Sequence, residues 1–337
     1  MANPDNPNNS FEVQCPATDS FSSLCWHPRQ NYLVATSWDN QVRCWEVMAT
    51  GQAVPKSATS HDAPPLCSQF HADGNSVFTA GCDKQAKRWD LATNQATQVA
   101  AHDAPIRHLS WINELNMLVT GSWDKTLRYW DLRQQSPAHT QTLPDKCYAL
   151  SVSHPLLVVG TAERYIQVFN LAKPDQVYKQ LQSPLKHQTR CIAAFPDKQT
   201  TGYLVGSIEG RVAVQHVDDH LASKNFTFKC HREEGGQDIY AVNSMCFHPT
   251  QGTFVTTGAD GTFNFWDKEN KQRLKAMSKC KAPIPCAAFN HDGTILSYAL
   301  SYDWHKGAAA HNPAAAINKI FLHAVQDSEV KQRKKTR

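Results

Sequence analysis

Two stretches of the chain contain the residue types of a hydrolytic triad at the same spacing. In each stretch a histidine precedes a threonine by 18 residues and an aspartate by 22, and a tryptophan follows the aspartate by six. A carboxylate that orients a histidine, which in turn contacts a hydroxyl group, is the arrangement that activates a serine nucleophile. The two sets are His61, Thr79, Asp83 and Trp89, and His102, Thr120, Asp124 and Trp130.

The arrangement is better explained as a structural network than as a catalytic site. Thr79 and Thr120 lie within apolar, strand-like runs, whereas a nucleophile must be exposed to its substrate. The set is also duplicated, and a degenerate copy has His187 with Glu209 but Gln215 at the tryptophan position. We therefore expect a chain of hydrogen bonds from carboxylate to histidine to threonine that ends on the indole N–H. The sequence has no metal-ligand spacing, cofactor motif or phosphate loop, which predicts a non-enzymatic protein without metal or cofactor.

The aspartates belong to a longer repeat. Short strand-like runs recur around an acidic turn residue, as in LVATSWDNQVRCWEV (33–47), and alternating apolar residues predict three strands per copy, with a fourth in the following linker. The copies are spaced by 44, 41, 39, 46, 51 and 43 residues, which is close to the period of a WD repeat. Seven copies predict an all-β, seven-bladed propeller. Their acidic residues are Asp39, Asp83, Asp124, Glu163, Glu209, Asp260 and Asp303.

The last copy ends after its third strand, so one blade of the ring lacks an outer strand. The stretch FEVQC (11–15), which precedes the first copy, can occupy this place and leave no large unpaired edge. This closure predicts a flexible N-terminal tail over residues 1–10, a single propeller over 11–326 and a basic C-terminal tail over 327–337.

Charge and composition restrict the class of protein. The formal net charge is +4, but the last seven residues, KQRKKTR, carry five positive charges, which leaves about −1 for the rest. Any nucleic-acid-binding surface must therefore be local. No apolar run is long enough to span a bilayer, and the start MANPDNPNNS does not resemble a signal peptide. Eleven cysteines without a CxxC pair are typical of buried side chains in a reducing compartment, which favours the nucleus or cytosol.

Large aromatic residues occupy a turn position where small residues would suffice. The residue before each acidic turn residue is expected on one flat face of the disc, and most copies have Cys, Ala or Ile there. Trp38, Trp123 and Tyr302 are the exceptions. An aromatic side chain at a surface is a typical anchor for a protein partner, although it can instead pack on a neighbouring loop. We expect these three residues to form a docking surface.

A second candidate surface combines cations with aromatic side chains in the fifth and sixth copies. Its residues come from EGRVAV (209–214), FTFKCHRE (226–233) and FWDKENKQR (265–273). Cations beside an apolar pocket suit an acidic peptide with one apolar side chain, or a phosphate backbone with a stacked base. Solvated charges over ordinary propeller aromatics are the alternative. The residues are Arg211, Phe228, Lys229, Trp266, Lys268 and Lys271.

Several motifs closely resemble those of the nuclear-pore-associated mRNA export factors of the WD-repeat family (Rae/Gle type). They are GSWDKTLRYWD (121–131), HDAPIRHLSW (102–111), QDIYAVNSMCFHP (237–249) and LSYDWHKG (300–307). The resemblance runs from FEVQC to the basic tail. Checkpoint propellers of the Bub family share the EGRVAV and SWD motifs, but the SYDW turn, the WDK of the sixth copy and the HDAP loop favour the export factors.

The resemblance implies a docking platform that binds the acidic GLEBS segment of a GLFG-repeat nucleoporin. Trp38 and Trp123 match the family's anchors, and Arg211 matches an arginine that pairs with the segment's glutamates. A location at the nuclear envelope, at the pore complex, with shuttling to the cytoplasm is also implied. A neighbouring groove is linked in the family to RNA backbone and acidic peptides, and Lys271 stands where the family commonly has arginine. The matching groove positions are Arg211, Phe228, Trp266, Asp267 and Lys268.

Two other functions stay open. A mitotic checkpoint adaptor of the Bub type would share the fold and bind checkpoint proteins at kinetochores rather than at the nuclear rim. The run Trp130, Asp131, Leu132 and Arg133 fits the WDxR pattern by which some propellers dock the adaptor of a cullin-type ubiquitin ligase. These four residues also follow from the repeat itself.

Overall fold

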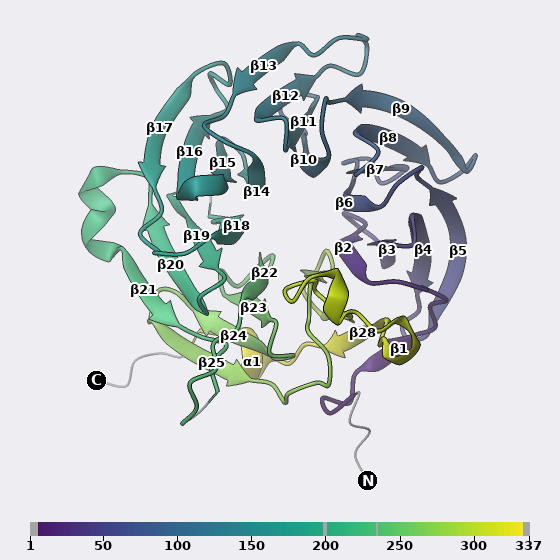
Figure 1. Ribbon diagram of the computed structural model, residues 1–337, viewed down its shortest axis with the longest axis vertical. Coiled ribbons are helices and arrows are strands. Elements are labelled where there is room, and N and C mark those ends of the chain that lie inside the picture. The colour runs from purple at the N-terminus through teal and green to yellow at the C-terminus, as the bar shows by residue number, and fades with distance from the viewer. Residues whose placement is uncertain (1–5, 198–200, 234, 333–337) are drawn as a thin grey trace.

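Seven four-stranded antiparallel sheets are arranged as blades around a central axis (Figure 1). The structure is a computed structural model that describes residues 6–197, 201–233 and 235–332. The all-β, seven-bladed propeller predicted from the repeat is confirmed. Each acidic turn residue lies between the second and third strands of its blade or next to them, so we call the face that carries these turns the upper face.

The first four blades follow the chain in order. From the axis outward, the strands of blade 1 are β2 (Phe21–Trp26), β3 (Tyr32–Ser37), β4 (Gln41–Val47) and β5 (Ala53–Ser60); of blade 2, β6 (Pro65–Phe70), β7 (Ser76–Gly81), β8 (Gln85–Asp90) and β9 (Gln95–Ala101); of blade 3, β10 (Ile106–Ile112), β11 (Met117–Ser122), β12 (Thr126–Trp130) and β13 (His139–Thr142); and of blade 4, β14 (Cys147–Ser153), β15 (Leu156–Thr161), β16 (Tyr165–Asn170) and β17 (Val177–Gln182).

The last three blades repeat this plan, and the first strand of the chain completes the ring. Blade 5 has β18 (Thr189–Ala194), β19 (Gly202–Ser207), β20 (Arg211–His216) and β21 (Phe226–Lys229); blade 6 has β22 (Val242–Phe247), β23 (Phe254–Gly258), β24 (Phe263–Asp267) and β25 (Gln272–Ala276); and blade 7 has β26 (Ala287–Phe289), β27 (Ile295–Leu300), β28 (Lys319–Ala324) and β1 (Phe11–Val13).

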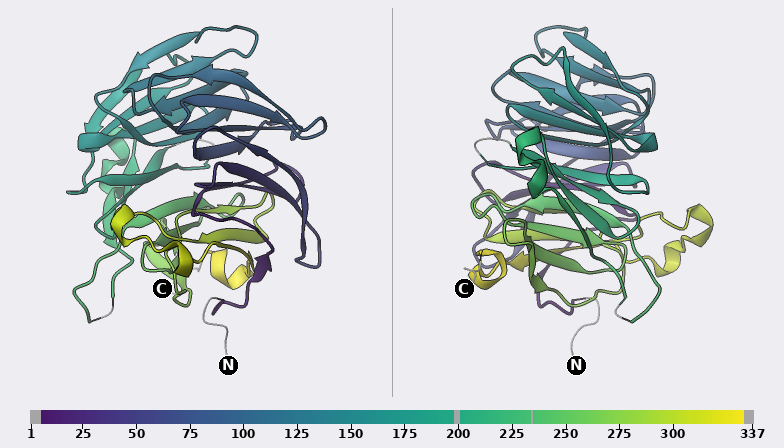
Figure 2. Two further views of the ribbon diagram at one scale, coloured as in Figure 1. Left: turned by 45° about the vertical axis from the view of Figure 1, so that its right-hand side comes forward. Right: turned by 90° about the vertical axis from the view of Figure 1, so that its left-hand side faces the viewer.

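Short helical turns lie outside the sheets. Figure 2 shows the disc from its edge, with the loop between β27 and β28 standing out from one face and α1 at the opposite face. Among the described residues, no helix is long and apolar enough to cross a membrane. The helical turns are η1 (Ala162–Arg164), η2 (Asp219–Lys224), η3 (Ala308–Ala310), η4 (Pro313–Ala315) and α1 (Asp327–Val330).

The hydrophobic core is divided among the seven interfaces between neighbouring blades. The second strands are almost entirely buried, because blades cover them on both faces; β7, β15 and β19 have no exposed residue. One apolar cluster joins Val34 and Trp89 of blades 1 and 2, and equivalent clusters fill every other interface, including that between blades 7 and 1. The ring is therefore packed without a break, which makes the upper face a rigid platform.

The N-terminal strand closes the ring as predicted. β1 pairs antiparallel with β28, and Val13 opposite Ile320 is only 2% exposed. The strand covers residues 11–13 of the expected 11–15, and the Gln14 carbonyl accepts a bond from the Trp45 indole at 3.3 Å. Both ends of the chain therefore stabilise one blade.

Ordered contacts extend past both expected domain boundaries. Residues 6–10 were expected in a tail, but Asn8 bonds the backbone of Ser278 in both directions and the Tyr298 hydroxyl contacts Ser10 at 3.1 Å. At the other end, α1 begins the expected basic tail, and Val330 within it is buried in the core. Residues 1–5 and 333–337 lie outside the described part of the chain.

Candidate functional site

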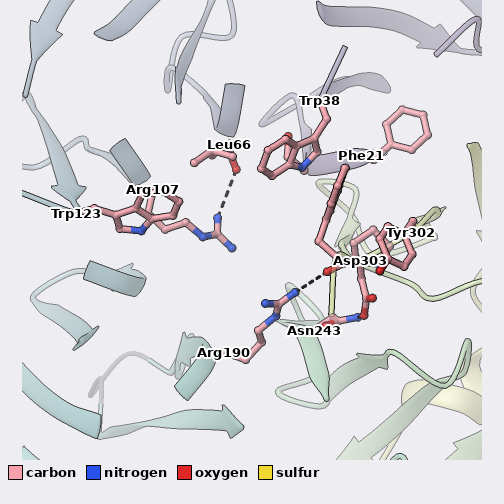
Figure 3. A pocket seen from close by; sticks show the side chains of 12 residues that line it. Phe21, Trp38, Leu66, Arg107, Trp123, Arg190, Asn243, Tyr302 and Asp303 are labelled. Atoms are coloured by element: carbon pink, nitrogen blue, oxygen red, sulfur yellow. Dashed lines mark hydrogen bonds between the residues drawn. The ribbon is translucent and has the colours of Figure 1, made fainter. Parts of the chain in front are cut away.

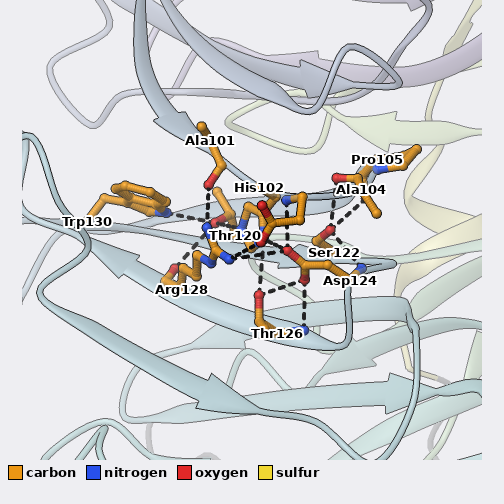
Figure 4. Close-up of polar contacts among 11 residues, drawn as sticks. Ala101, His102, Ala104, Pro105, Thr120, Ser122, Asp124, Thr126, Arg128 and Trp130 are labelled. Carbon is orange, nitrogen blue, oxygen red and sulfur yellow. Dashed lines mark hydrogen bonds and ion pairs between the residues drawn. The ribbon is translucent and has the colours of Figure 1, made fainter.

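The network of blade 3 joins the second and third strands of the blade to the loop before it through one histidine (Figure 4). The Nδ1 atom of His102 lies 2.8 Å from Asp124 Oδ2, and its Nε2 lies 2.7 Å from the Thr120 hydroxyl. The Trp130 indole N–H donates to the same hydroxyl at 2.8 Å. A neutral His102 with its proton on Nδ1 satisfies every one of these groups, because Nε2 then accepts the threonine O–H. The bonds follow the order that we expected from the sequence.

Burial keeps this network inert. It lowers the pKa of His102, and the Asp124 charge opposes the shift only in part. Burial on its own would raise the pKa of Asp124, but hydrogen bonds from Thr126 and His102 hold it below its usual value. The Thr120 side chain is completely buried. A hydroxyl group that no substrate can reach has no nucleophilic role, so the network serves the fold.

Blade 2 departs from the expected pattern at its tryptophan, which corrects our assignment. His61 contacts Asp83 at 2.7 Å and Thr79 at 2.8 Å, as expected. The Trp89 indole, however, donates to the Asn94 side chain at 2.9 Å rather than to Thr79. Asn94 adopts a left-handed backbone conformation (φ 56°) in the turn after β8, and this brings its carboxamide within reach of the indole.

Blade 6 contains a second complete network, which we did not predict from the sequence. His231 contacts Asp260 at 2.9 Å and Thr256 at 2.8 Å, and the Trp266 indole donates to Thr256 at 2.9 Å. The threonine and tryptophan stand at the usual offsets of four residues before and six after the aspartate, which was the available signal. The histidine lies 29 residues before the aspartate instead of 22, because the loop after β21 is longer.

The three aromatic turn residues meet at one cavity on the axis (Figure 3). This axial cavity of about 180 Å³ is lined by residues of six blades, among them Trp38, Trp123 and Tyr302. All three side chains are half-buried. Trp304, which sequence reasoning did not single out, lies with its ring 5.3 Å from Trp38 and 5.4 Å from Tyr302. Its signal was the second aromatic residue of the SYDW turn.

Trp123 stands apart from this aromatic cluster. In Figure 3 it lies across the cavity from Trp38 and Tyr302. Tyr302 is fixed by its hydroxyl, which donates to the Gly307 carbonyl at 2.9 Å. The mouth of the axial cavity therefore has aromatic surface on two sides, and it is half-covered rather than flat and open.

Arg211 lies at the upper end of blade 5. It begins β20, its Nε is 3.6 Å from Glu209 Oε2, and 32% of its side chain is exposed. Lys229 stands directly opposite on β21. The partial pairing with Glu209 leaves most guanidinium donors of Arg211 available to a partner.

Aromatic rings connect this basic end with the other side of the disc, between blades 5 and 6. Phe228 lies 4.5 Å from Trp266 and 6.2 Å from Phe226, measured between ring centres. The Lys271 ammonium lies over the Phe226 ring at 4.8 Å. We call this strip, from Arg211 and Lys229 through the aromatic residues to Lys271, the lateral groove.

Two residues expected in the groove are less accessible than their charges suggest. Asp267 is 1% exposed, and its carboxylate accepts bonds from the Glu269 N–H at 2.9 Å and the Asn270 side chain at 2.7 Å. Lys268 pairs with Glu269, lies over the Phe195 ring at 4.3 Å and has a side chain only 10% exposed. Asp267 thus stabilises a turn, and Lys268 must leave Glu269 before it can bind another anion.

The WDxR run ends in an ion pair. Arg133 donates from Nε to Asp131 Oδ1 at 2.8 Å and from Nη2 to Oδ2 at 2.6 Å. This bidentate bond holds the pKa of Asp131 at about 2. Trp130 is buried, whereas the Arg133 side chain is 80% exposed. The arginine is therefore the most exposed residue of the run, and Leu132 beside it is half-buried.

Among the described residues, no group of three or more histidine, cysteine, aspartate or glutamate side chains is arranged to hold a metal ion.

Comparison with known proteins identifies the family of the chain. Four segments, residues 9–46, 55–90, 94–131 and 223–267, match the family description "WD domain, G-beta repeat". "Protein RAE1" of Arabidopsis thaliana is 62% identical over 330 residues, which cover 97% of this chain and 93% of the relative. "Poly(A)+ RNA export protein" of Schizosaccharomyces pombe is 48% identical, with 96% and 93% covered. "mRNA export factor" of Xenopus tropicalis is 47% identical, with 98% and 93% covered. The chain therefore belongs to the RAE1 family of WD-repeat mRNA export factors.

Proposed function

We propose that this protein is a non-enzymatic docking platform in mRNA export. The main support is the aromatic mouth of the axial cavity, which lies on a packed, rigid ring. The relatives of the chain are also named for RNA export. The platform acts at the nuclear envelope, at the pore complex, and shuttles to the cytoplasm.

The partner on the upper face is the acidic GLEBS segment of a GLFG-repeat nucleoporin. Trp38, Trp123 and Tyr302 give it aromatic surface, and such side chains are the residue types that dominate binding energy at protein interfaces. Arg211, with 32% of its side chain exposed, supplies a charge-assisted hydrogen bond to a glutamate. The half-buried state of the aromatic side chains favours this role, because little conformational entropy is lost when a partner covers them.

The lateral groove binds RNA backbone or an acidic peptide. Local charge supports this assignment: residues 268–281 contain six Lys or Arg residues against one glutamate, although the whole chain has a net charge of only +4. The aromatic residues beside Lys271 offer a surface on which a base or an apolar side chain can stack. Phosphate contacts of this kind carry little sequence information, so RNA binding is sequence-indifferent.

Co-purification tests the docking function directly. The tagged protein, expressed at its natural level, is isolated from cells and its partners are quantified by mass spectrometry. A GLEBS-bearing nucleoporin recovered in stoichiometric amount supports the proposal. Recovery of checkpoint proteins in its place would move the assignment to the kinetochore adaptors.

A second candidate function rests on Arg133. Its exposed guanidinium is held by Asp131 in a fixed orientation beside a surface pocket that also contains Trp130 and Gln98. This geometry suits docking of a ubiquitin-ligase adaptor. Loss of the adaptor from pull-downs with Arg133→Ala, while the nucleoporin is retained, supports it as an additional role.

A further inference from the structure

Six blades share one irregularity at the start of the innermost strand. The register between the first and second strands shifts there, which leaves one residue of the first strand without a partner. A β-bulge turns such a side chain away from the regular ladder. In five of the six blades the side chain lines the axial cavity. These five residues are Ser22, Leu66, Arg107, Arg190 and Asn243.

Two of these side chains are arginines that share the cavity (Figure 3). Arg107 Nη1 lies 3.5 Å from the Leu66 carbonyl, and Arg190 Nη2 lies 3.3 Å from the Asp303 carbonyl. Both distances are at the long end for a hydrogen bond. Within the described residues neither guanidinium forms an ion pair with a carboxylate. Burial, and then the charge of Arg190, lower the pKa of Arg107, so the fold holds two like charges close together at a cost.

The rest of the lining adds hydrogen-bond donors. The indole N–H groups of Trp123 and Trp304 are buried and reach no acceptor among the described residues. Among the described residues that line the cavity, Asp303 carries the one carboxylate, which already accepts a bond from the Asn243 side chain at 2.9 Å and another from His305. The lining therefore has two guanidinium groups and one carboxylate, which is already hydrogen-bonded, so the cavity has an excess of positive charge.

We propose that the axial cavity is an oxyanion-binding site in which Arg107 and Arg190 hold one phosphate or carboxylate group, with the Trp123 and Trp304 N–H groups as further donors. A cavity of about 180 Å³ corresponds to roughly six water molecules at about 30 Å³ each. It therefore has room for one such group. Both arginine side chains are half-buried, so the anion offsets the cost of holding two like charges close together, and planar guanidinium groups match the oxygens of either anion.

The oxyanion in the cavity can come from two sources, a free anion or an acidic side chain of a bound peptide. The site itself requires neither the nucleoporin nor the docking function proposed above. It is therefore tested first on the free protein with inorganic phosphate, at constant ionic strength with chloride as the balancing anion. Tryptophan fluorescence reports binding, because Trp38, Trp123 and Trp304 line the cavity.

The variants are Arg107→Leu, Arg190→Leu and Arg107→Lys, with Arg29→Leu, at an exposed arginine outside the cavity lining, as the matched control. We expect saturable binding in the wild type and in the control, and binding weaker by roughly tenfold or more in both leucine variants, as is typical for loss of a charged hydrogen bond. Arg107→Lys retains the charge but loses the planar fork, so binding falls between these values. The melting temperature of the phosphate-free protein stays equal or rises with Arg107→Leu, since a half-buried charge without a carboxylate partner is removed.

Three results overturn the proposal: no saturable response to phosphate in the wild type, unchanged titrations in the leucine variants, or a clear loss of stability in phosphate-free Arg107→Leu, which would give the arginine a structural role. If Arg190→Leu fails to fold, an affinity of Arg107→Lys for phosphate equal to that of the wild type also overturns the proposal. A final titration identifies the source of the anion. Phosphate that weakens binding of an acidic peptide identifies a peptide carboxylate, whereas independent binding identifies a free anion.

Discussion

The Trp130 indole N–H donates to the hydroxyl of Thr120 at a distance of 2.8 Å. The same hydroxyl contacts His102, so one threonine ties the second and third strands of blade 3 to the loop before the blade. In blade 2 the equivalent Thr79 serves only His61, because Trp89 bonds Asn94. Two blades that look alike in sequence therefore depend on their threonine to different degrees.

This difference predicts unequal costs for the same substitution. Thr120→Val leaves both a histidine nitrogen and an indole N–H without a partner, whereas Thr79→Val affects only the histidine. Each buried unpaired group costs about 1–3 kcal/mol. We expect Thr120→Val to lower the free energy of unfolding by roughly twice as much as Thr79→Val in urea titrations. Equal losses would show that the indole bond contributes nothing to stability.

Closure of the ring by β1 predicts a large effect of a small deletion. Removal of residues 1–16 exposes the edge of β28 and removes Val13 from the core, so the melting temperature falls by many degrees. Val13→Asp has a similar effect without shortening the chain. Phe11→Ser, at a side chain that is 49% exposed, is the control and leaves the melt nearly unchanged. A deletion variant with the wild-type melting curve contradicts the closure.

Buried histidines make stability depend on pH. Burial lowers the pKa of His27, His102, His108 and His248, so these residues stay neutral in the fold at a pH where the unfolded chain, with a pKa near 6.5, is already protonated. The unfolded state then binds more protons, and stability falls as the pH drops below about 6.5. We expect the melting temperature to fall by several degrees between pH 7.5 and pH 5.5.

One substitution isolates this effect. His108→Gln removes the group whose pKa lies well below its usual value and so flattens the dependence of the melting temperature on pH. His187→Gln is the control, because that side chain is 59% exposed. If the melting temperature of His108→Gln depends on pH as steeply as that of the wild type, His108 is not a source of the pH dependence.

Backbone contacts in the lateral groove predict a steep salt dependence of RNA binding. For single strands the logarithm of the binding constant falls with the logarithm of salt concentration, with a slope of about −0.7 per phosphate contacted. Lys271→Ala reduces the slope by about that amount, and Lys229→Ala does the same. Lys56→Ala, in blade 1, is the control. Fluorescence anisotropy with unstructured RNA at several salt concentrations gives the slopes, and a flat dependence in the wild type rules the groove out as an RNA site.

The sequence predicts the ring because the repeat and its strand pattern are local features. The spacing of Asp39 and its equivalents predicts the number of blades, and the alternation of apolar and polar residues predicts the strands. The network of blade 6 escaped detection, since the loop after β21 moves His231 out of the usual spacing. Trp89 was assigned to the wrong acceptor, because the backbone conformation of Asn94 decides that bond.

The axial cavity depends on features that no local pattern reveals. Arg107 and Arg190 lie 83 residues apart in the sequence, and a bulge in each strand brings them together. Charge in the sequence also did not reveal that Lys268 is nearly covered. Burial and pairing of this kind arise only when blades pack against each other.

Calorimetric titration with a GLEBS peptide tests whether the upper face docks the nucleoporin segment. The wild type and Arg133→Ala are compared with the double variant Trp123→Ala, Arg211→Ala, after melting curves have shown that all three proteins are folded. We expect the wild type and the control to bind the peptide with one-to-one stoichiometry and the double variant to show no binding. Wild-type affinity for the peptide in a folded double variant would rule out docking through Trp123 and Arg211.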